Sequence, residues 1–203
     1  GNIVGGSTSV SGNTIQGSAN IAQHYPYSYH NAIANDFGSS ISISGDGLTV
    51  AIGSPGGWTY WPGQSLQYPR LNRVSIFHLV EDVWVEKGRA IFEQDVESWQ
   101  NTQQMGRDVA LSYNGDIVAI GQPYGGSYSQ TNWSDCPGYV SVHKYYKEAD
   151  HWGRLGEPIY GDSGQLVALT SISDNGNIVA IAAGSGLSPP AQSVRVFQNI
   201  NNS

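Results

Sequence analysis

The chain has little of the basic charge on which several classes of binding protein depend. Only 12% of its 203 residues are charged, nine are lysine or arginine, and the formal net charge is −7. Nucleic acids and anionic membrane surfaces bind clustered basic side chains, and here the cations are scattered singly. We therefore expect neither a nucleic acid nor a membrane surface as the partner.

Cysteine and long apolar runs are scarce as well. Cys136 is the only cysteine, which excludes an internal disulfide and a cysteine-based metal cluster. No histidine is close to Cys136 in the sequence to activate it, so an inert thiol is favoured over a nucleophile. No apolar run reaches the roughly 18 residues of a transmembrane helix, so no membrane span is predicted.

Segments rich in the strong helix formers Ala, Leu, Glu and Lys are almost absent. The chain instead contains 26 glycines, together with many Ser, Thr, Asn, Val, Ile and Tyr residues. This composition is typical of short strands joined by tight turns. We predict an all-β fold with almost no helix.

An internal repeat accounts for most of the chain. Three stretches align: SISGDGLTVAIGSP (42–55), LSYNGDIVAIGQP (111–123) and SISDNGNIVAIAAG (171–184). Each reads as a strand, a turn and a second strand. The turn pairs are typical of type I′ hairpins, in which both central residues have positive φ; they are Asp46-Gly47, Asn114-Gly115 and Asn175-Gly176.

Further strands are expected after each hairpin. A third segment with period-2 alternation occurs at 72–79, 138–145 and 192–199. The first two repeats continue into a fourth segment with a tryptophan four residues before a glycine, at 83–92 and 151–160. Four short strands per repeat are typical of propeller blades.

We interpret the chain as a single repeat domain over 1–203. Residues 1–33 form an N-terminal strand and linker, 34–98 the first blade, 99–163 the second, and 164–203 a third blade that lacks its fourth strand. The predicted fold is therefore three four-stranded, propeller-like blades. The N-terminal strand of the same or of a neighbouring subunit would complete the last blade.

The repeat resembles the FG-GAP-type repeat, the blade unit of integrin-like propellers. Five stretches carry the resemblance: Phe37-Gly38, Asp46-Gly47, VAIGSP (50–55), GYVSV (138–142) and Trp152 to Gly161. It implies an extracellular or cell-surface protein with a role in recognition, adhesion or scaffolding. The DxDxDG calcium loop of many integrin-type blades is missing, so calcium is not implied, and the third repeat has Leu166-Val167 in place of Phe-Gly.

The stretch VSGNTIQGS (10–18) aligns with the fourth segment of the second repeat. Gly12, Ile15 and Gly17 match the two glycines and the isoleucine of LGEPIYG (155–161). We therefore expect these residues to form a donor strand for the incomplete last blade. The strand could fold back on its own chain or add to the next molecule; the second arrangement is head to tail and generates a filament unless it closes a ring.

Two other groups of residues are candidates for binding or modification. Aromatic side chains are dense in two segments, at Tyr25, Tyr27, Tyr29, Trp58, Tyr60 and Trp61. They could pack within the fold, form a subunit interface or stack on carbohydrate. Asn132 and Asn201 begin N-glycosylation sequons, which matter if the chain is secreted from a eukaryotic cell.

No pattern of catalytic or cofactor-binding residues is recognisable. The sequence contains no GxSxG, phosphate-loop or dinucleotide fingerprint, and its five histidines have no metal-binding spacing. We expect no catalytic, cofactor or metal residues and no enzymatic activity. The predicted function is an extracellular structural subunit that polymerises head to tail into a fibre or appendage through its N-terminal strand. The alternative is a monomeric adhesion or carbohydrate-binding module that uses the loop aromatics.

Overall fold

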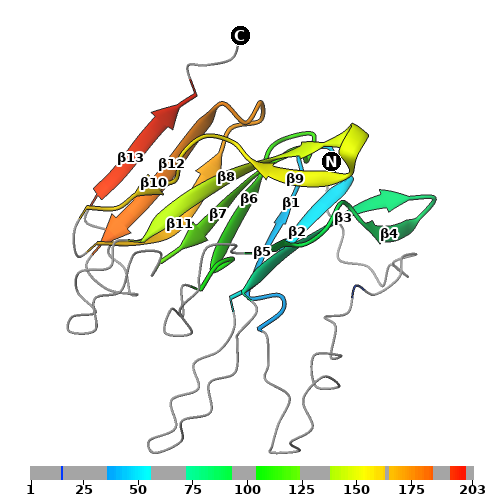
Figure 1. The fold of residues 1–203 in the computed structure, drawn as a ribbon, viewed down its shortest axis with the longest axis horizontal. Coiled ribbons are helices and arrows are strands. Elements are labelled where there is room, and N and C mark those ends of the chain that lie inside the picture. The colour runs from blue at the N-terminus through cyan, green and yellow to red at the C-terminus, as the bar shows by residue number, and fades with distance from the viewer. Residues whose placement is uncertain are drawn as a thin grey trace, which may run out of the picture.

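The structure is a computed structural model of the 203-residue chain. It describes residue 15 and residues 36–55, 72–92, 104–123, 138–162, 165–184 and 193–199. These residues form antiparallel β-sheets, as the composition predicts (Figure 1). Among them, the helical structure is limited to the 3₁₀ turn η3 at Lys147–Ala149, and no helix is long and apolar enough to cross a membrane.

The strands form three sheets that follow the three repeats. The first sheet has the order β1-β2-β3-β4, with β5 also paired to β3; its strands are β1 (Ser40–Ile43), β2 (Thr49–Ser54), β3 (Arg73–Val80), β4 (Val83–Glu86) and β5 (Ile91–Phe92). The second sheet repeats this order with β6 (Asp108–Leu111), β7 (Ile117–Gln122), β8 (Tyr139–Tyr146), β9 (His151–Arg154) and β10 (Ile159–Tyr160). The third sheet has β11 (Leu166–Ile172), β12 (Ile178–Gly184) and β13 (Ser193–Gln198).

The predicted fourth strand is split in two. In the first sheet β4 and β5 pair with opposite ends of β3, and in the second sheet β9 and β10 do the same along β8. Gly88 and Gly156 lie between the two halves with φ of 68° and 76°, a conformation that favours glycine. The glycine four residues after each tryptophan, Gly88 after Trp84 and Gly156 after Trp152, therefore marks the break in the strand.

The prediction of type I′ turns for the three hairpins is wrong, although each hairpin is where it was expected. In each turn the glycine has positive φ, but Asp46, Asn114 and Asn175 do not. The glycine N–H instead donates to the carbonyl of a serine three residues earlier, as from Gly47 to Ser44 at 2.9 Å. A longer turn of this kind needs positive φ only at the glycine.

Type I′ geometry occurs at the charged turn between β3 and β4. Val80 pairs with Val83, and both intervening residues, Glu81 and Asp82, have positive φ of 48° and 64°. This turn contains no glycine, so the residue preference that predicts type I′ turns does not find it.

The three sheets stack face to face, with the second in the middle (Figure 1). One apolar core lies between the first and second sheets and contains Val74, Ile76, Met105 and Ile120. A second core lies between the second and third sheets around Val140, Val167 and Ile181. Successive antiparallel sheets packed in this way are the arrangement of propeller blades, and the chain has a β-propeller-like fold.

Candidate functional site

Most of the predicted site residues lie outside the described residues. This holds for two of the donor-strand residues, both sequons and all six loop aromatics: Gly12, Gly17, Asn132, Asn201, Tyr25, Tyr27, Tyr29, Trp58, Tyr60 and Trp61. Ile15, the middle residue of the expected donor strand, is described and is half-buried. The structure therefore bears mainly on the surfaces that such a strand would meet.

The third sheet ends the stack with an exposed apolar face. Val194 and Val196 on β13 are 68% and 67% exposed. They share this side of the sheet with Leu169, Ile178, Ala180 and Ala182, and we call these six residues the third-sheet face. Since large apolar patches are uncommon on monomeric proteins, this face is a candidate interaction surface.

The repeat shows what such a face does elsewhere in the molecule. Val194 pairs with Ala182 as Val74 pairs with Gly53 and as Val140 pairs with Gly121. Val74 and Val140 are fully buried because another sheet packs against them. The third-sheet face is therefore the exposed copy of a surface that is covered twice within the chain.

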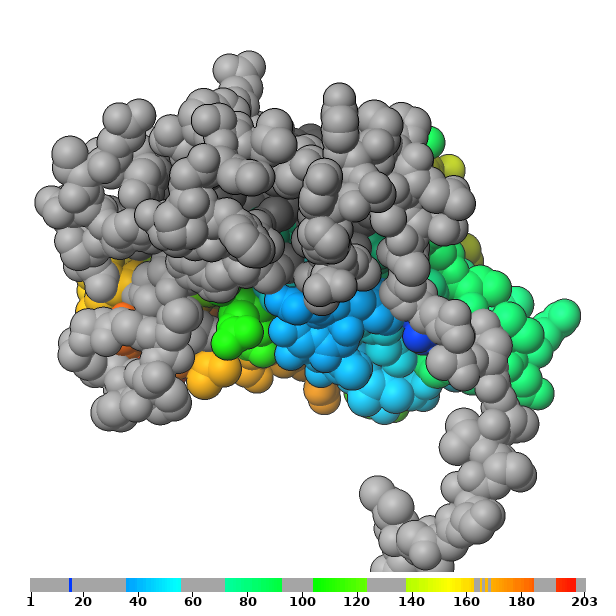
Figure 2. All heavy atoms as spheres, turned by 90° about the horizontal axis from the view of Figure 1, so that it is seen from below, coloured from blue at the N-terminus to red at the C-terminus, as the bar shows by residue number. Residues whose placement is uncertain are grey.

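The first sheet carries the opposite face at the other end of the stack. Ile41 and Ile43 on β1 are 66% and 60% exposed. Half-buried Val50 and Phe77 lie on the same side, and we call these four residues the first-sheet face. Residues 36–54, in blue and cyan, form a continuous patch on one side of the molecule (Figure 2).

The first-sheet face also has buried counterparts. Ile41 pairs with Ile52 as Val109 pairs with Ile120, and Ile43 corresponds in the same way to Leu111. Val109 and Leu111 are buried against the first sheet. Ile52 and Ser75 on the same side are buried, so the first sheet exposes the β1 part of this face. Each end of the stack therefore exposes residues that are equivalent to those at the interfaces between neighbouring sheets.

Polar contacts between the first strands fix how one sheet sits on the next. Ser42 Oγ accepts a hydrogen bond from Leu111 N–H at 3.0 Å, and Ser40 Oγ donates to the carbonyl of Gly106 at 2.7 Å. At the second junction, Asp108 takes the place of Ser40 and accepts from Thr170 N–H. Burial raises the pKa of the Asp108 carboxyl above its usual value, and this hydrogen bond opposes the rise.

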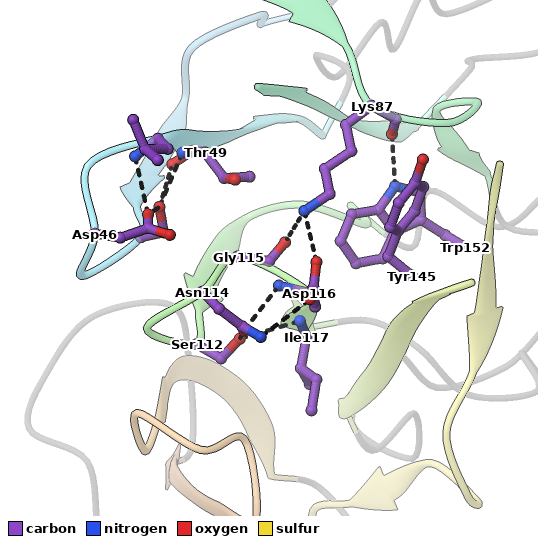
Figure 3. A network of polar contacts seen from close by, with 12 residues as sticks. Asp46, Thr49, Lys87, Ser112, Asn114, Gly115, Asp116, Ile117, Tyr145 and Trp152 are labelled. Carbon is purple, nitrogen blue, oxygen red and sulfur yellow. Dashed lines mark hydrogen bonds and ion pairs between the residues drawn. The ribbon is translucent and has the colours of Figure 1, made fainter. Parts of the chain in front are cut away.

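A lysine network holds the first and second sheets together near their outer edges (Figure 3). Lys87 Nζ donates to the carbonyl of Gly115 and to Asp116 Oδ1, both at 2.8 Å. The ammonium group lies over the rings of Tyr145 and Trp152, and the Trp152 indole N–H donates to the Lys87 carbonyl at 2.7 Å. Since every polar atom here has a partner within the fold, we interpret the network as structural.

Three histidines lie on the described strands: His78 on β3, His143 on β8 and the exposed His151 on β9. His78 pairs with Thr49, whereas His143 pairs with Val118, so the two are one register position apart and do not occupy equivalent positions in their repeats. His143 is buried and contacts Ser141 Oγ through Nε2, and burial, followed by the nearby charge of Arg154, lowers its pKa to about 4. In the part of the chain that the structure describes, no three metal-ligating side chains come together.

Comparisons with known proteins give structural neighbours and no family. No family model matches the chain, and no curated protein matches it. Solved structures that resemble it include U3-55K, with 14% identity and a TM-score of 0.47 over 79% of this chain, and the WD40 repeats of RRP9, with 13% identity and a TM-score of 0.46 over 78%. A complex of KlAtg21 with the coiled coil of AgAtg16 matches with 13% identity and a TM-score of 0.48 over 80%. The chain spans 42%, 41% and 40% of those structures.

Proposed function

We propose that the protein is a non-enzymatic structural subunit that assembles head to tail into a fibre or appendage by N-terminal strand addition. The observation that supports this is the open edge of β13. The third strands of the other sheets, β3 and β8, are paired along both edges, whereas in the described residues β13 pairs with β12 alone. An unpaired edge offers a row of backbone donors and acceptors to an added strand.

The order of strands along the chain supports the same partner for this edge. The last strand segment of the first sheet, β5, leads on to β6 of the second, and β10 leads on to β11 of the third. In both cases, the strand segment that comes before a new sheet in the chain pairs within the preceding sheet. By the same rule, a strand around Ile15, which comes before β1, would pair within a sheet that precedes the first sheet. In a head-to-tail assembly, that sheet is the third sheet of the preceding copy.

The pairing register of the added strand follows from the repeat. Ile91 pairs with Val74 in the first sheet, and Ile159 pairs with Val140 in the second. Since Ile15 aligns with these isoleucines and Val194 with these valines, we expect Ile15 opposite Val194. Burying the two side chains stabilises the contact by about 1.5–3 kcal/mol each.

Addition to another molecule is favoured over closure on the same chain. Self-closure would bring the third sheet against the first, and would cover the residues at the two ends of the stack. Ile41 and Val194 are instead among the most exposed large apolar residues, and the first and third sheets lie on opposite sides of the second (Figure 1).

As part of the same proposal, we put this subunit outside the cell or at the cell surface, as a resemblance to FG-GAP repeats would imply, with Asn132 and Asn201 as glycan acceptors. The alternative, a monomeric adhesion or carbohydrate-binding module, rests on the loop aromatics alone. The open edge and the two exposed faces favour the assembling subunit.

Deleting residues 1–17 tests the strand. We expect intact protein to form assemblies in light scattering and negative-stain microscopy, and the deleted protein to lose most of them while keeping its far-ultraviolet circular dichroism. Deleting residues 1–9 is the matched control, because it leaves the aligned stretch 11–17 in place. A monomeric intact protein at high concentration, or assemblies unchanged by the longer deletion, would overturn the proposal; Ile15→Asp repeats the test without shortening the chain.

A further inference from the structure

We infer that the interface between copies continues the internal stacking, with the third-sheet face of one copy packed against the first-sheet face of the next. This inference rests on the proposed head-to-tail assembly, but it names surfaces that strand addition does not require. The partner is a second copy of this chain. Its first sheet packs on the third sheet of the first copy in the same way as the second sheet packs on the first, and the third on the second, within one chain.

The two faces are complementary because the chain already joins such surfaces twice. At both internal junctions, a face equivalent to the third-sheet face packs on one equivalent to the first-sheet face. The exposed valines of β13 occupy the positions equivalent to Val74 and Ile76, which pack against the second sheet. Ile41 occupies the position equivalent to Val109, which packs against the first sheet. Both ends of the stack therefore have the residue types and the positions of a working interface.

Charge does not oppose this contact at the third-sheet face. The chain has a net charge of −7, yet the six residues of this face are aliphatic, and Ser171 and Gln198 on the same side are neutral. Desolvation of such a face exposes no charged group to an apolar surface. The third-sheet face therefore brings no unpaired charge into the contact, whereas Arg73 and Glu86 lie on the side of the first sheet that would cover it.

The junction between the second and third sheets is the closer precedent for the contact between copies. A Cβ at Gly53 would lie 2.0 Å from the carbonyl oxygen of Gly106, so the first junction leaves no room for a side chain there. For a Cβ at the equivalent Gly121 the three nearest atoms all belong to Asp108 in the same sheet, at 3.3 to 3.8 Å. The third-sheet face has Ala182 at this position, which the wider spacing of the second junction admits.

The internal hydrogen bonds predict which residues meet across the contact. Within the chain, the hydroxyl of Ser42 accepts a hydrogen bond from the backbone N–H of Leu111 across the first junction. Ser171 on the third sheet is equivalent to Ser42, and Ile43 on the first sheet is equivalent to Leu111. We therefore expect Ser171 of one copy to lie beside Ile43 of the next. We therefore expect cysteines at these two positions to cross-link under oxidation.

A cross-linking experiment tests this pairing. In a Cys136→Ser background, protein with Ser171→Cys is mixed with protein with Ile43→Cys under mild oxidation, and we expect a covalent heterodimer as the main product. The matched control mixes Ser171→Cys with Lys147→Cys, because Lys147 is exposed on η3 at neither end face. Heterodimer no more abundant than in the control, or mainly Ser171→Cys homodimer, would overturn the inference.

A second pair of variants separates the faces from the strand. Ile41→Lys with Ile43→Lys changes exposed residues and leaves residues 1–17 intact, and we expect it to lower assembly at least tenfold. The matched control is Val83→Lys with Val85→Lys, which also places two lysines at exposed positions, on β4. Normal assembly of the Ile41/Ile43 variant, together with loss of assembly on deletion of residues 1–17, would overturn this inference and leave strand addition in place. Loss of assembly in the Ile41/Ile43 variant, together with normal assembly after the deletion, would overturn strand addition alone.

Discussion

At the scale of single residues, His143 makes the stability of the fold depend on pH. It occupies the position that phenylalanine has in the other two repeats, at Phe77 and Phe197. The folded chain lowers its pKa from 6.5 to about 4, mainly by burial. Well above pH 6.5 the imidazole is neutral in both states. As the pH falls through 6.5 towards 4, the unfolded chain takes up a proton that the folded chain does not, so stability is lost.

We therefore predict that His143→Phe removes an acid sensitivity of about 2–3 kcal/mol between pH 7 and pH 4.5. The measurement is urea unfolding at both pH values. Ser141→Ala is the control, since it removes the contact at 3.1 Å but keeps the buried imidazole, and it should retain the sensitivity. If His143→Phe and the unmodified protein lost equal stability between pH 7 and pH 4.5, His143 would not be the source of the acid sensitivity.

At the scale of elements, each hairpin turn depends on a serine. Ser112 Oγ donates to Asn114 Oδ1 at 3.0 Å and accepts from Ile117 N–H at 3.1 Å, and Ser173 makes the same two bonds in the third repeat. Ser112 is buried whereas the bonds of Ser173 are exposed to water. We predict that Ser112→Ala lowers the free energy of unfolding by about 1–3 kcal/mol and that Ser173→Ala costs less, since water replaces its bonds. Equal losses in urea titrations of the two variants would contradict this.

These turns also show how far the sequence predicts an element. The aligned Asx-Gly pairs predict where each hairpin turns, because only a few residue types favour that backbone. They do not predict the turn type, which is set by a serine two residues before the Asx, at Ser44, Ser112 and Ser173. This serine is visible in the aligned repeats, but the residue preference for type I′ turns considers only the two central residues and does not include it. At Glu81-Asp82 the type I′ turn forms without glycine, because the pairing of β3 with β4 sets its geometry.

At the scale of the whole molecule, the alternating pattern predicts the sheets but not their exposed faces. Val194 and Val74 occupy equivalent positions in matching strands, yet one is exposed and the other fully buried. The difference comes from whether another sheet follows, which a local pattern does not contain. The donor strand was predicted from the count of strands per repeat, whereas the two faces required the packing of the sheets.

Because the two ends of the stack differ, one blocked end should stop growth in one direction. A copy with Ile41→Lys and Ile43→Lys keeps its third-sheet face, so it can join the first-sheet face at the end of a growing assembly, where its own first-sheet face then accepts no further copy. We predict that small amounts of this variant, mixed with unmodified protein, shorten the assemblies in proportion to its fraction, as measured by contour length in negative-stain images. The Val83→Lys, Val85→Lys variant at the same fractions should leave the length unchanged. If the Ile41/Ile43 variant were merely left out of assemblies of normal length, its third-sheet face would not engage the neighbouring copy.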